Sequence, residues 1–160
     1  MKNQNKINIF TENIKIPFKE IDKKYATACC MSVLRELDLN KKEINIILCS
    51  NEFIHSVNKD YRKKDRPTDV ISFAYREDEF PNNSIDEIEQ LGDIFLSLEK
   101  AYEQSIEYEV TLKEEFLRLV IHSILHLIGY DHETNEADAE IMRSREDKLM
   151  NSIEESLLRT

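Results

Sequence analysis

Hydrophobic and polar positions along the chain predict four strands and five helices. Short runs rich in β-branched residues and bounded by polar turns predict strands over 7–10, 43–49, 69–75 and 93–98. Apolar residues that recur every three or four positions predict helices over 17–37, from Ser50 onward, near 99–108, from Thr111 to about 128 and over about 136–156.

The same spacing indicates which side of each helix faces the core. We expect the first helix to begin near Pro17. The fourth has a T-x-x-E capping box at Thr111 and Glu114, and it is apolar nearly all round, so we expect it to be central and buried. The other expected inward positions are Phe18, Ile21, Tyr25, Ala28 and Cys29 in the first helix, Ile54, Val57 and Tyr61 in the second, and Ile141, Met142, Leu149 and Ile153 in the last.

The order of these elements predicts an α+β fold. The first strand, helix and strand can form a right-handed parallel unit. The acidic connection over 77–90, interpreted as a solvated loop, allows the third and fourth strands to pair antiparallel. We therefore expect a single domain over 1–160, with a small mixed four-stranded sheet packed against about five helices.

Composition and charge narrow the possible functions. The chain has 160 residues, of which 41% are hydrophobic and 34% charged, and this composition is typical of a soluble globular protein. Its net charge of −10 is unfavourable for a nucleic-acid binder unless the basic residues cluster. The N-terminus lacks the apolar core of a signal peptide, and no segment is apolar enough for a membrane span. The three cysteines, Cys29, Cys30 and Cys49, form no C-x-x-C pair. We therefore expect reduced core thiols in a cytoplasmic protein.

Three of the four histidines lie in the eleven-residue stretch HSILHLIGYDH, 122–132. His122 and His126 share one face of the central helix, one turn apart, which is a usual way for a helix to offer two metal ligands. His132 would point away if the helix continued. However, Gly129 can end the helix in a left-handed conformation, so that the following residues carry His132 back to the pair. The sequence therefore predicts a metal site on the buried central helix and the loop after it.

The ligand spacing resembles that of the metzincin protease zinc site, HExxHxxGxxH. Ser123 occupies the position of the protease's catalytic glutamate, and a serine hydroxyl cannot serve as that general base, so peptide hydrolysis is disfavoured. Three neutral imidazoles suit one zinc ion per chain with an open fourth position, which is typical of catalytic sites. We expect His55 to be a surface residue rather than a fourth ligand.

Residues 58–66, hereafter the basic segment, hold five basic side chains against two acidic ones. Lysines near the negative end of a helix account for part of this cluster. An arginine here could bind a phosphate through two parallel hydrogen bonds, and such an arginine beside a metal ion suits phosphodiester cleavage. The basic residues are Lys59, Arg62, Lys63, Lys64 and Arg66.

Three blocks of the sequence together resemble a known family. HSILHLIGYDH resembles the H-G-x-L-H-L-x-G-Y-D-H signature of the YbeY-type endoribonucleases, which are bacterial and organellar enzymes of rRNA maturation. NKDYRKKDRPTDVISF and LGDIFLS resemble the family's N-x-x-Y-R-x-x-D-x-x-T-D-V-L-S-F and G-D-I-x-I-S blocks, in the same order. The resemblance extends from about Ser50 to Met150. It departs at Ser123, where glycine is usual, and at Ala74, where proline is common.

The resemblance implies a single-strand-specific, zinc-dependent endoribonuclease that acts in maturation of the small-subunit rRNA 3′ end and in ribosome quality control. It implies that His122, His126 and His132 hold the zinc ion, whose bound water attacks the phosphodiester. It also implies that Arg62 is catalytic and contacts RNA, and that Lys64 binds RNA. The expected partners are single-stranded RNA, rRNA and the small ribosomal subunit with its proteins, and neither DNA nor a membrane.

Two alternatives stay open. One is a metallohydrolase that acts on peptides or small phosphoesters, with Glu140 or Glu146 as its base. The other is a non-enzymatic ribosome assembly factor with a structural zinc ion. Asp131 can either orient a metal ligand or form the turn. Asp69 and Asp93 match family positions, and we assign them only strand-end hydrogen bonds.

Overall fold

The computed structural model describes residues 4–14, 18–75, 87–130 and 135–158 and has an α+β fold built on a four-stranded sheet. The strands are β1 (Lys6–Glu12), β2 (Lys42–Cys49), β3 (Val70–Ala74) and β4 (Glu89–Ser97), in the spatial order β1-β2-β4-β3. The pairs β1–β2 and β2–β4 are parallel, and β3–β4 is antiparallel, which confirms the predicted mixed sheet. The helices are α1 (Lys23–Glu36), α2 (Asn51–Arg62), α3 (Leu98–Glu107), α4 (Leu112–Leu127) and α5 (Glu136–Leu158).

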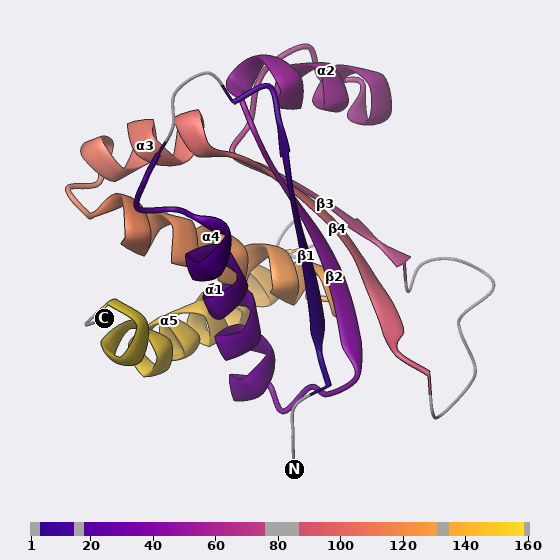
Figure 1. The fold of residues 1–160 in the computed structure, drawn as a ribbon, viewed down its shortest axis with the longest axis vertical. Coiled ribbons are helices and arrows are strands. Elements are labelled where there is room, and N and C mark those ends of the chain that lie inside the picture. Colours follow the sequence, from indigo (N-terminus) through magenta and orange to yellow (C-terminus); the bar gives the residue numbers. More distant parts are fainter. Residues whose placement is uncertain (1–3, 15–17, 76–86, 131–134, 159–160) are drawn as a thin grey trace.

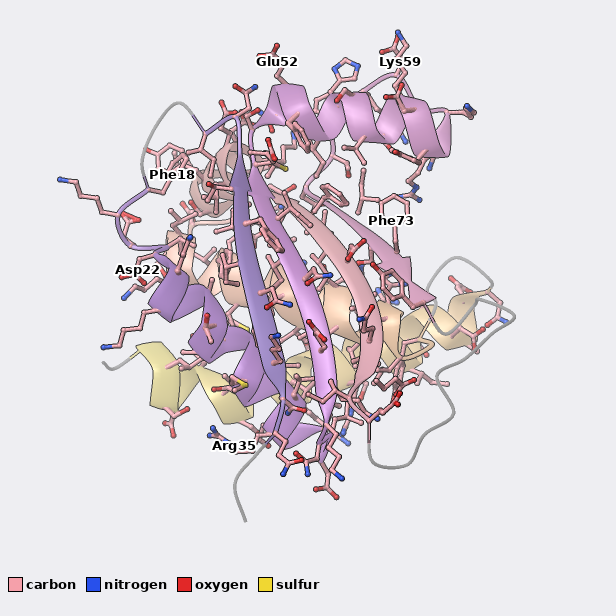
Figure 2. The ribbon with its side chains drawn as sticks, turned by 45° about the vertical axis from the view of Figure 1, so that its right-hand side comes forward. Phe18, Asp22, Arg35, Glu52, Lys59 and Phe73 are labelled. Carbon is pink, nitrogen blue, oxygen red and sulfur yellow. The ribbon has the colours of Figure 1, made fainter. Side chains whose placement is uncertain are left out.

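The two faces of the sheet are covered unequally. In Figure 1, α1, α3, α4 and α5 lie on one side of the sheet, and α2 lies across the top of it. Side chains alternate along β2, so that Ile44 and Ile46 belong to the larger core under the four helices, whereas Cys49 belongs to a smaller core under α2. Figure 2 shows the other face of the sheet, which no helix covers below α2.

The central helix of the larger core is α4, as the sequence predicts. The Thr111 hydroxyl accepts a hydrogen bond from the backbone N–H of Glu114 at 3.0 Å and caps the helix. Eleven of the sixteen residues of α4 are buried. Each large apolar side chain among them, such as Phe116, contributes about 1.5–3 kcal/mol by its burial. This packing fixes α4 against the sheet and the neighbouring helices.

The helix α2 covers only one end of the opposite face. The Ser50 hydroxyl accepts a hydrogen bond from the N–H of Phe53 at 3.1 Å, which starts the helix where the sequence predicts. Ile54 and Val57 are buried as expected, but the expectation that Tyr61 faces the core is wrong, because this residue is 72% exposed. The helix ends one residue later, at Arg62, so no further turn adds packing around the tyrosine ring.

Two element boundaries differ from the prediction. The first helix begins at Lys23 rather than near Pro17, which lies outside the described residues. Asp22 starts it, because its Oδ1 accepts the N–H of Tyr25 at 2.7 Å. The last strand begins at Glu89 instead of 93, because β2 offers it pairing partners from Lys42 onward. Most of the acidic connection over 77–90 lies outside the described residues, so its interpretation as a loop stays a prediction.

The last helix differs from expectation on one face. Met142, Leu149 and Ile153 are buried, but Ile141 is 57% exposed. Adjacent helical positions diverge by about 100°, so Ile141 and Met142 cannot both face the core.

The three cysteines are buried and free, as expected of core thiols. Within the described ranges, no helix combines the length and the apolar character that crossing a bilayer requires.

Candidate functional site

His122 and His126 lie one turn apart on α4. Their ring centroids are 4.8 Å apart and their planes meet at 71°, so both rings can reach a common ligand. The expected third ligand, His132, lies outside the described residues, as does Asp131. Among the residues that are described, no group of three or more His, Cys, Asp or Glu side chains could hold a metal ion. The three-histidine site therefore stays a prediction.

The turn after the histidine pair forms at Gly129, as expected. Its backbone is left-handed, with φ of +111°. The N–H of Gly129 donates to the carbonyl of His126 at 3.1 Å, and the N–H of Tyr130 donates to that of Leu125 at 3.0 Å. This is the Schellman pattern of helix ends. It reverses the chain directly after His126, which is the change of direction that a ligand at position 132 requires.

Glu146 of α5 lies against the first histidine. Its Oε1 is 2.5 Å from Nδ1 of His122, and the side chain of Glu146 is only 14% exposed. A carboxylate can only accept, so this contact places the proton of a neutral His122 ring on Nδ1 and its lone pair on Nε2. Metal-binding histidines commonly have such a carboxylate partner. The contact is therefore of the kind found behind metal-binding histidines.

A second polar cluster lies earlier on α4, around Glu115. Glu115 is 1% exposed and accepts two hydrogen bonds from Arg118, at 2.9 Å from Nε and 2.5 Å from Nη2. Nε2 of Gln104 donates to the same carboxylate at 2.6 Å and lies 3.4 Å from Oδ2 of Asp69. The hydrogen bonds to Glu115 raise the pKa of Arg118, and the charges of Asp69 and Glu146 raise it further. Arg118 is therefore cationic, and its charge interacts with those of Asp69 at the start of β3 and of Glu146.

The basic segment forms the exposed end of α2 and the turn after it. Lys63 ends the helix in a left-handed conformation, with φ of 60°. The buried Asn58 side chain donates to the carbonyl of Arg66 at 2.8 Å and folds the following turn back onto the helix. His55 lies at the surface, as expected, with Nε2 2.6 Å from Oδ1 of Asp65, and this hydrogen bond, then the charge of Lys59, lowers the pKa of Asp65.

The histidine pair and the basic segment belong to helices on opposite faces of the edge strand β3. Both α2 and α4 pack against this strand. Gly92 of the neighbouring strand makes the approach of α4 possible. A Cβ at this position would lie 2.1 Å from the carbonyl oxygen of Phe73 and 2.8 Å from Cδ2 of Leu127. Leu127, the residue that follows His126, therefore lies directly against Gly92 of β4, beside its partner strand β3.

Sequence comparisons identify the family. A family model described as endoribonuclease YbeY matches residues 6–154. The chain is 45% identical to endoribonuclease YbeY of Sulfurihydrogenibium sp. over 96% of its own length and 97% of that protein. It is 38% identical to endoribonuclease YbeY of Persephonella marina over 92% and 94% of the two chains. The chain belongs to the YbeY family.

The fold agrees with this membership. The solution structure of TM1509 from Thermotoga maritima superimposes with a TM-score of 0.58 at 28% identity, over 90% of this chain and 86% of that one. The YbeY relatives are endoribonucleases, so the enzyme class that the three sequence blocks imply, a hydrolase of RNA phosphodiester bonds, is confirmed. The individual roles of Arg62, Lys64 and the three histidines stay predictions.

The sequence suggests Glu146 only as the base of the metallohydrolase alternative, and not as the partner of His122. The two residues are 24 positions apart and on different helices, so periodicity gives no sign of their contact. Asp69 hydrogen-bonds at the start of β3, with Oδ1 2.7 Å from the N–H of Val70. Asp93 instead lies within β4, where it accepts hydrogen bonds from Asn45 and Tyr75.

Proposed function

We propose that this YbeY-family chain is a zinc-dependent, single-strand-specific endoribonuclease that acts in rRNA maturation in the cytoplasm, at the small-subunit rRNA 3′ end and in ribosome quality control. The observation that carries the proposal is the pair of histidines on α4, with His122 held by Glu146 and with a chain reversal directly after His126. The proposed substrate is single-stranded rRNA, with contacts to the small ribosomal subunit and its proteins.

The donor chemistry fits one zinc ion per chain. Imidazole nitrogens suit zinc, and the Glu146 contact favours the tautomer with its lone pair on Nε2. His122, His126 and His132 would hold the ion and leave one position open. Bound there, zinc supplies a Lewis acid that lowers the pKa of water to near neutrality. Glu146 keeps His122 oriented, and the positive charge of Arg118 interacts with that carboxylate.

Arg62 and Lys64 supply the charge that an RNA substrate needs. Both lie in the exposed basic segment at the end of α2. We assign to Arg62 the binding of the scissile phosphate through two parallel N–H donors, which offsets the charge that builds on its non-bridging oxygens. Lys64, a flexible point charge, binds a neighbouring phosphate. Peptide hydrolysis is less well supported, because the carboxylate of Glu146 is already engaged by His122.

The test is cleavage of a labelled RNA that has a hairpin and a single-stranded tail. Native protein is compared with His126→Ala, with Arg62→Ala and with Arg35→Ala, a control at an exposed arginine on the last turn of α1. We expect the native chain and the control to cut only the tail, and a chelator to stop them. Arg62→Ala should lower the rate by roughly 100- to 1,000-fold, as loss of one charge-stabilising donor does.

Two outcomes would contradict the proposal. Cutting that persists in both His126→Ala and Arg62→Ala would come from a contaminating nuclease. Native protein that is folded and contains zinc but cuts no RNA, with or without ribosomal subunits, would support the assembly-factor alternative instead.

A further inference from the structure

Tyr61 is the most exposed large hydrophobic side chain in the described part of the chain, at 72%. It lies on the last turn of α2, between Asp60 and Arg62 and therefore inside the basic segment. Single exposed aromatic residues are common on protein surfaces and need no explanation. What separates Tyr61 from these is the way its ring is supported and the charge around it.

A chain of aromatic rings supports Tyr61 from below. Its ring meets that of Phe73 on β3 at 5.7 Å and 73°, and Phe73 meets Phe95 on β4 at 5.8 Å and 90°. Phe95 in turn lies 6.3 Å from Phe53 at the start of α2. Such contacts are favourable and restrict the rotation of each ring. Tyr61 is thus anchored through one contact while most of its surface stays open to solvent.

The charge around the ring complements a nucleic acid. Lys59, Arg62, Lys63 and Lys64 are all exposed within three residues of Tyr61, in a chain whose net charge is −10. Proteins that bind single-stranded nucleic acid combine basic side chains that follow the phosphates with aromatic rings on which bases stack. The end of α2 has basic side chains and an aromatic ring within one helical turn. Lys63 ends the helix there.

The position of Tyr61 is compatible with one RNA strand reaching both the ring and the histidines. The ring of Phe73 contacts Tyr61 on one face of β3. The carbonyl of Phe73 and the side chain of Leu127, which follows His126, both crowd the position of Gly92. β3 is an edge strand, so the sheet ends between the two sites. Figure 2 shows Phe73 on this outer strand, below the end of α2 that carries Lys59.

We propose that Tyr61 is a stacking platform for an unpaired nucleobase of the substrate. The proposal rests on the proposed function in taking RNA as the ligand. A base inside a duplex has both faces covered by its neighbours, whereas an unpaired base can place one face on the tyrosine ring. Tyr61 therefore supplies part of the preference for single strands, while Arg62 and Lys64 bind the phosphates on either side.

The test measures binding of a short, nuclease-resistant single-stranded RNA that contains one 2-aminopurine, whose fluorescence is quenched by stacking. The variants are Tyr61→Leu, which removes the aromatic ring, and Tyr61→Phe, which keeps it. Tyr102→Leu is the matched control, because Tyr102 is a half-exposed tyrosine on α3 outside the basic segment. Circular dichroism confirms that each variant is folded.

We expect Tyr61→Leu to weaken single-strand binding roughly 5- to 150-fold, the range for loss of one stacked base, and to abolish the quench. Duplex binding, and the dependence of single-strand affinity on salt, should not change, because no charge is lost. Tyr61→Phe and Tyr102→Leu should behave as native protein. Native affinity and quench in Tyr61→Leu, together with normal RNA cleavage, would overturn this inference alone. A native chain that neither binds nor cuts RNA would overturn the proposed function with it.

Discussion

At the scale of single residues, the contact between His122 and Glu146 is the most specific feature of the candidate site. We expect Glu146→Gln to weaken zinc binding roughly 10- to 100-fold, as loss of a carboxylate behind a metal-binding histidine typically does. An amide can still accept from Nδ1, but without a negative charge it no longer fixes the tautomer or raises the basicity of Nε2. Competition against a chromophoric chelator measures the change in affinity.

The metal-free protein provides a second readout for the same variant. Nitrogen NMR of His122 should report the proton on Nδ1 in the native chain and a mixture of tautomers in Glu146→Gln. Asp147→Asn, one residue further along α5 and exposed, is the control. Equal zinc affinity in Glu146→Gln and Asp147→Asn would show that Glu146 only packs against the ring.

The cysteines lead to a prediction about reactivity. Burial raises the pKa of Cys29 and of Cys49 from about 9 to about 12, and that of Cys30 well above its usual value. The thiolate is the reactive form, so native protein at pH 8 should react with iodoacetamide at least about 100-fold more slowly than unfolded protein. Mass spectrometry counts the modified thiols. Fast labelling of any one of them would mean that the core opens locally.

The raised pKa values of the cysteines also predict how the stability of the fold depends on pH. A raised pKa means that the folded state binds the thiol proton more tightly than the unfolded state does. The stabilisation that this tighter proton binding gives the folded state is complete below about pH 9 and is lost as the pH rises towards 12. The free energy of unfolding should therefore fall over this interval.

At the residue scale, a site can be predicted from the sequence where its residues lie in one segment at regular spacing. The shared helix face of His122 and His126 and a left-handed backbone at Gly129 follow from helical geometry alone, and the structure has both. Ser123, which departs from the usual glycine, is accommodated because its hydroxyl donates to the carbonyl of Leu119 at 2.8 Å in a fully buried position. Glu146 could not be paired in this way, because only tertiary packing brings α5 to α4.

At the scale of secondary structure elements, the two glycines of the chain differ in how much a substitution by alanine should destabilise the fold. A Cβ at Gly129 would meet no atom within 4 Å, so only the left-handed backbone resists substitution. Gly129→Ala should lower the free energy of unfolding by about 1–2 kcal/mol. At Gly92 a Cβ would also overlap the carbonyl of Phe73 and the side chain of Leu127, so Gly92→Ala should cost about 2–5 kcal/mol.

Urea denaturation of both variants tests this order. Zinc affinity adds a second readout, because the turn at Gly129 is expected to carry His132 to the site, so Gly129→Ala should also bind the metal more weakly. Equal stability losses in the two variants would contradict the contact geometry around Gly92.

The start of a helix could be predicted where the sequence contains a clear N-cap residue. Ser50 and Thr111 begin α2 and α4 at the expected positions. The start of α1 was misplaced because Pro17 is an apparent start signal, whereas Asp22 supplies the cap. Tyr61 has helical spacing with Ile54 and Val57 yet lies outside the core, because spacing gives the face of a helix but not the end of the helix, and α2 ends one residue after Tyr61.

At the scale of the whole molecule, the fold class followed from the order of the elements, because a strand–helix–strand unit and an acidic connection leave few arrangements of four strands. The insertion of β4 between β2 and β3 was not predicted. Both faces of β2 carry apolar side chains, and this composition fits a central strand without indicating which strand becomes its second neighbour.

The whole molecule also poses an electrostatic problem, since a chain with a net charge of −10 must bind a polyanion. If the basic segment alone makes the phosphate contacts, the logarithm of the RNA affinity should fall linearly with the logarithm of the salt concentration, with a slope of about −0.7 per contacted phosphate. Arg62→Ala and Lys64→Ala should each reduce the magnitude of this slope by about 0.7, and the double variant by about twice that.

Arg35→Ala removes the same charge from the end of α1, outside the basic segment, and should leave the slope unchanged. A slope that falls equally in all three single variants would mean that net charge, rather than the local cluster, controls binding, and the assignment of RNA contacts to Arg62 and Lys64 would then be wrong.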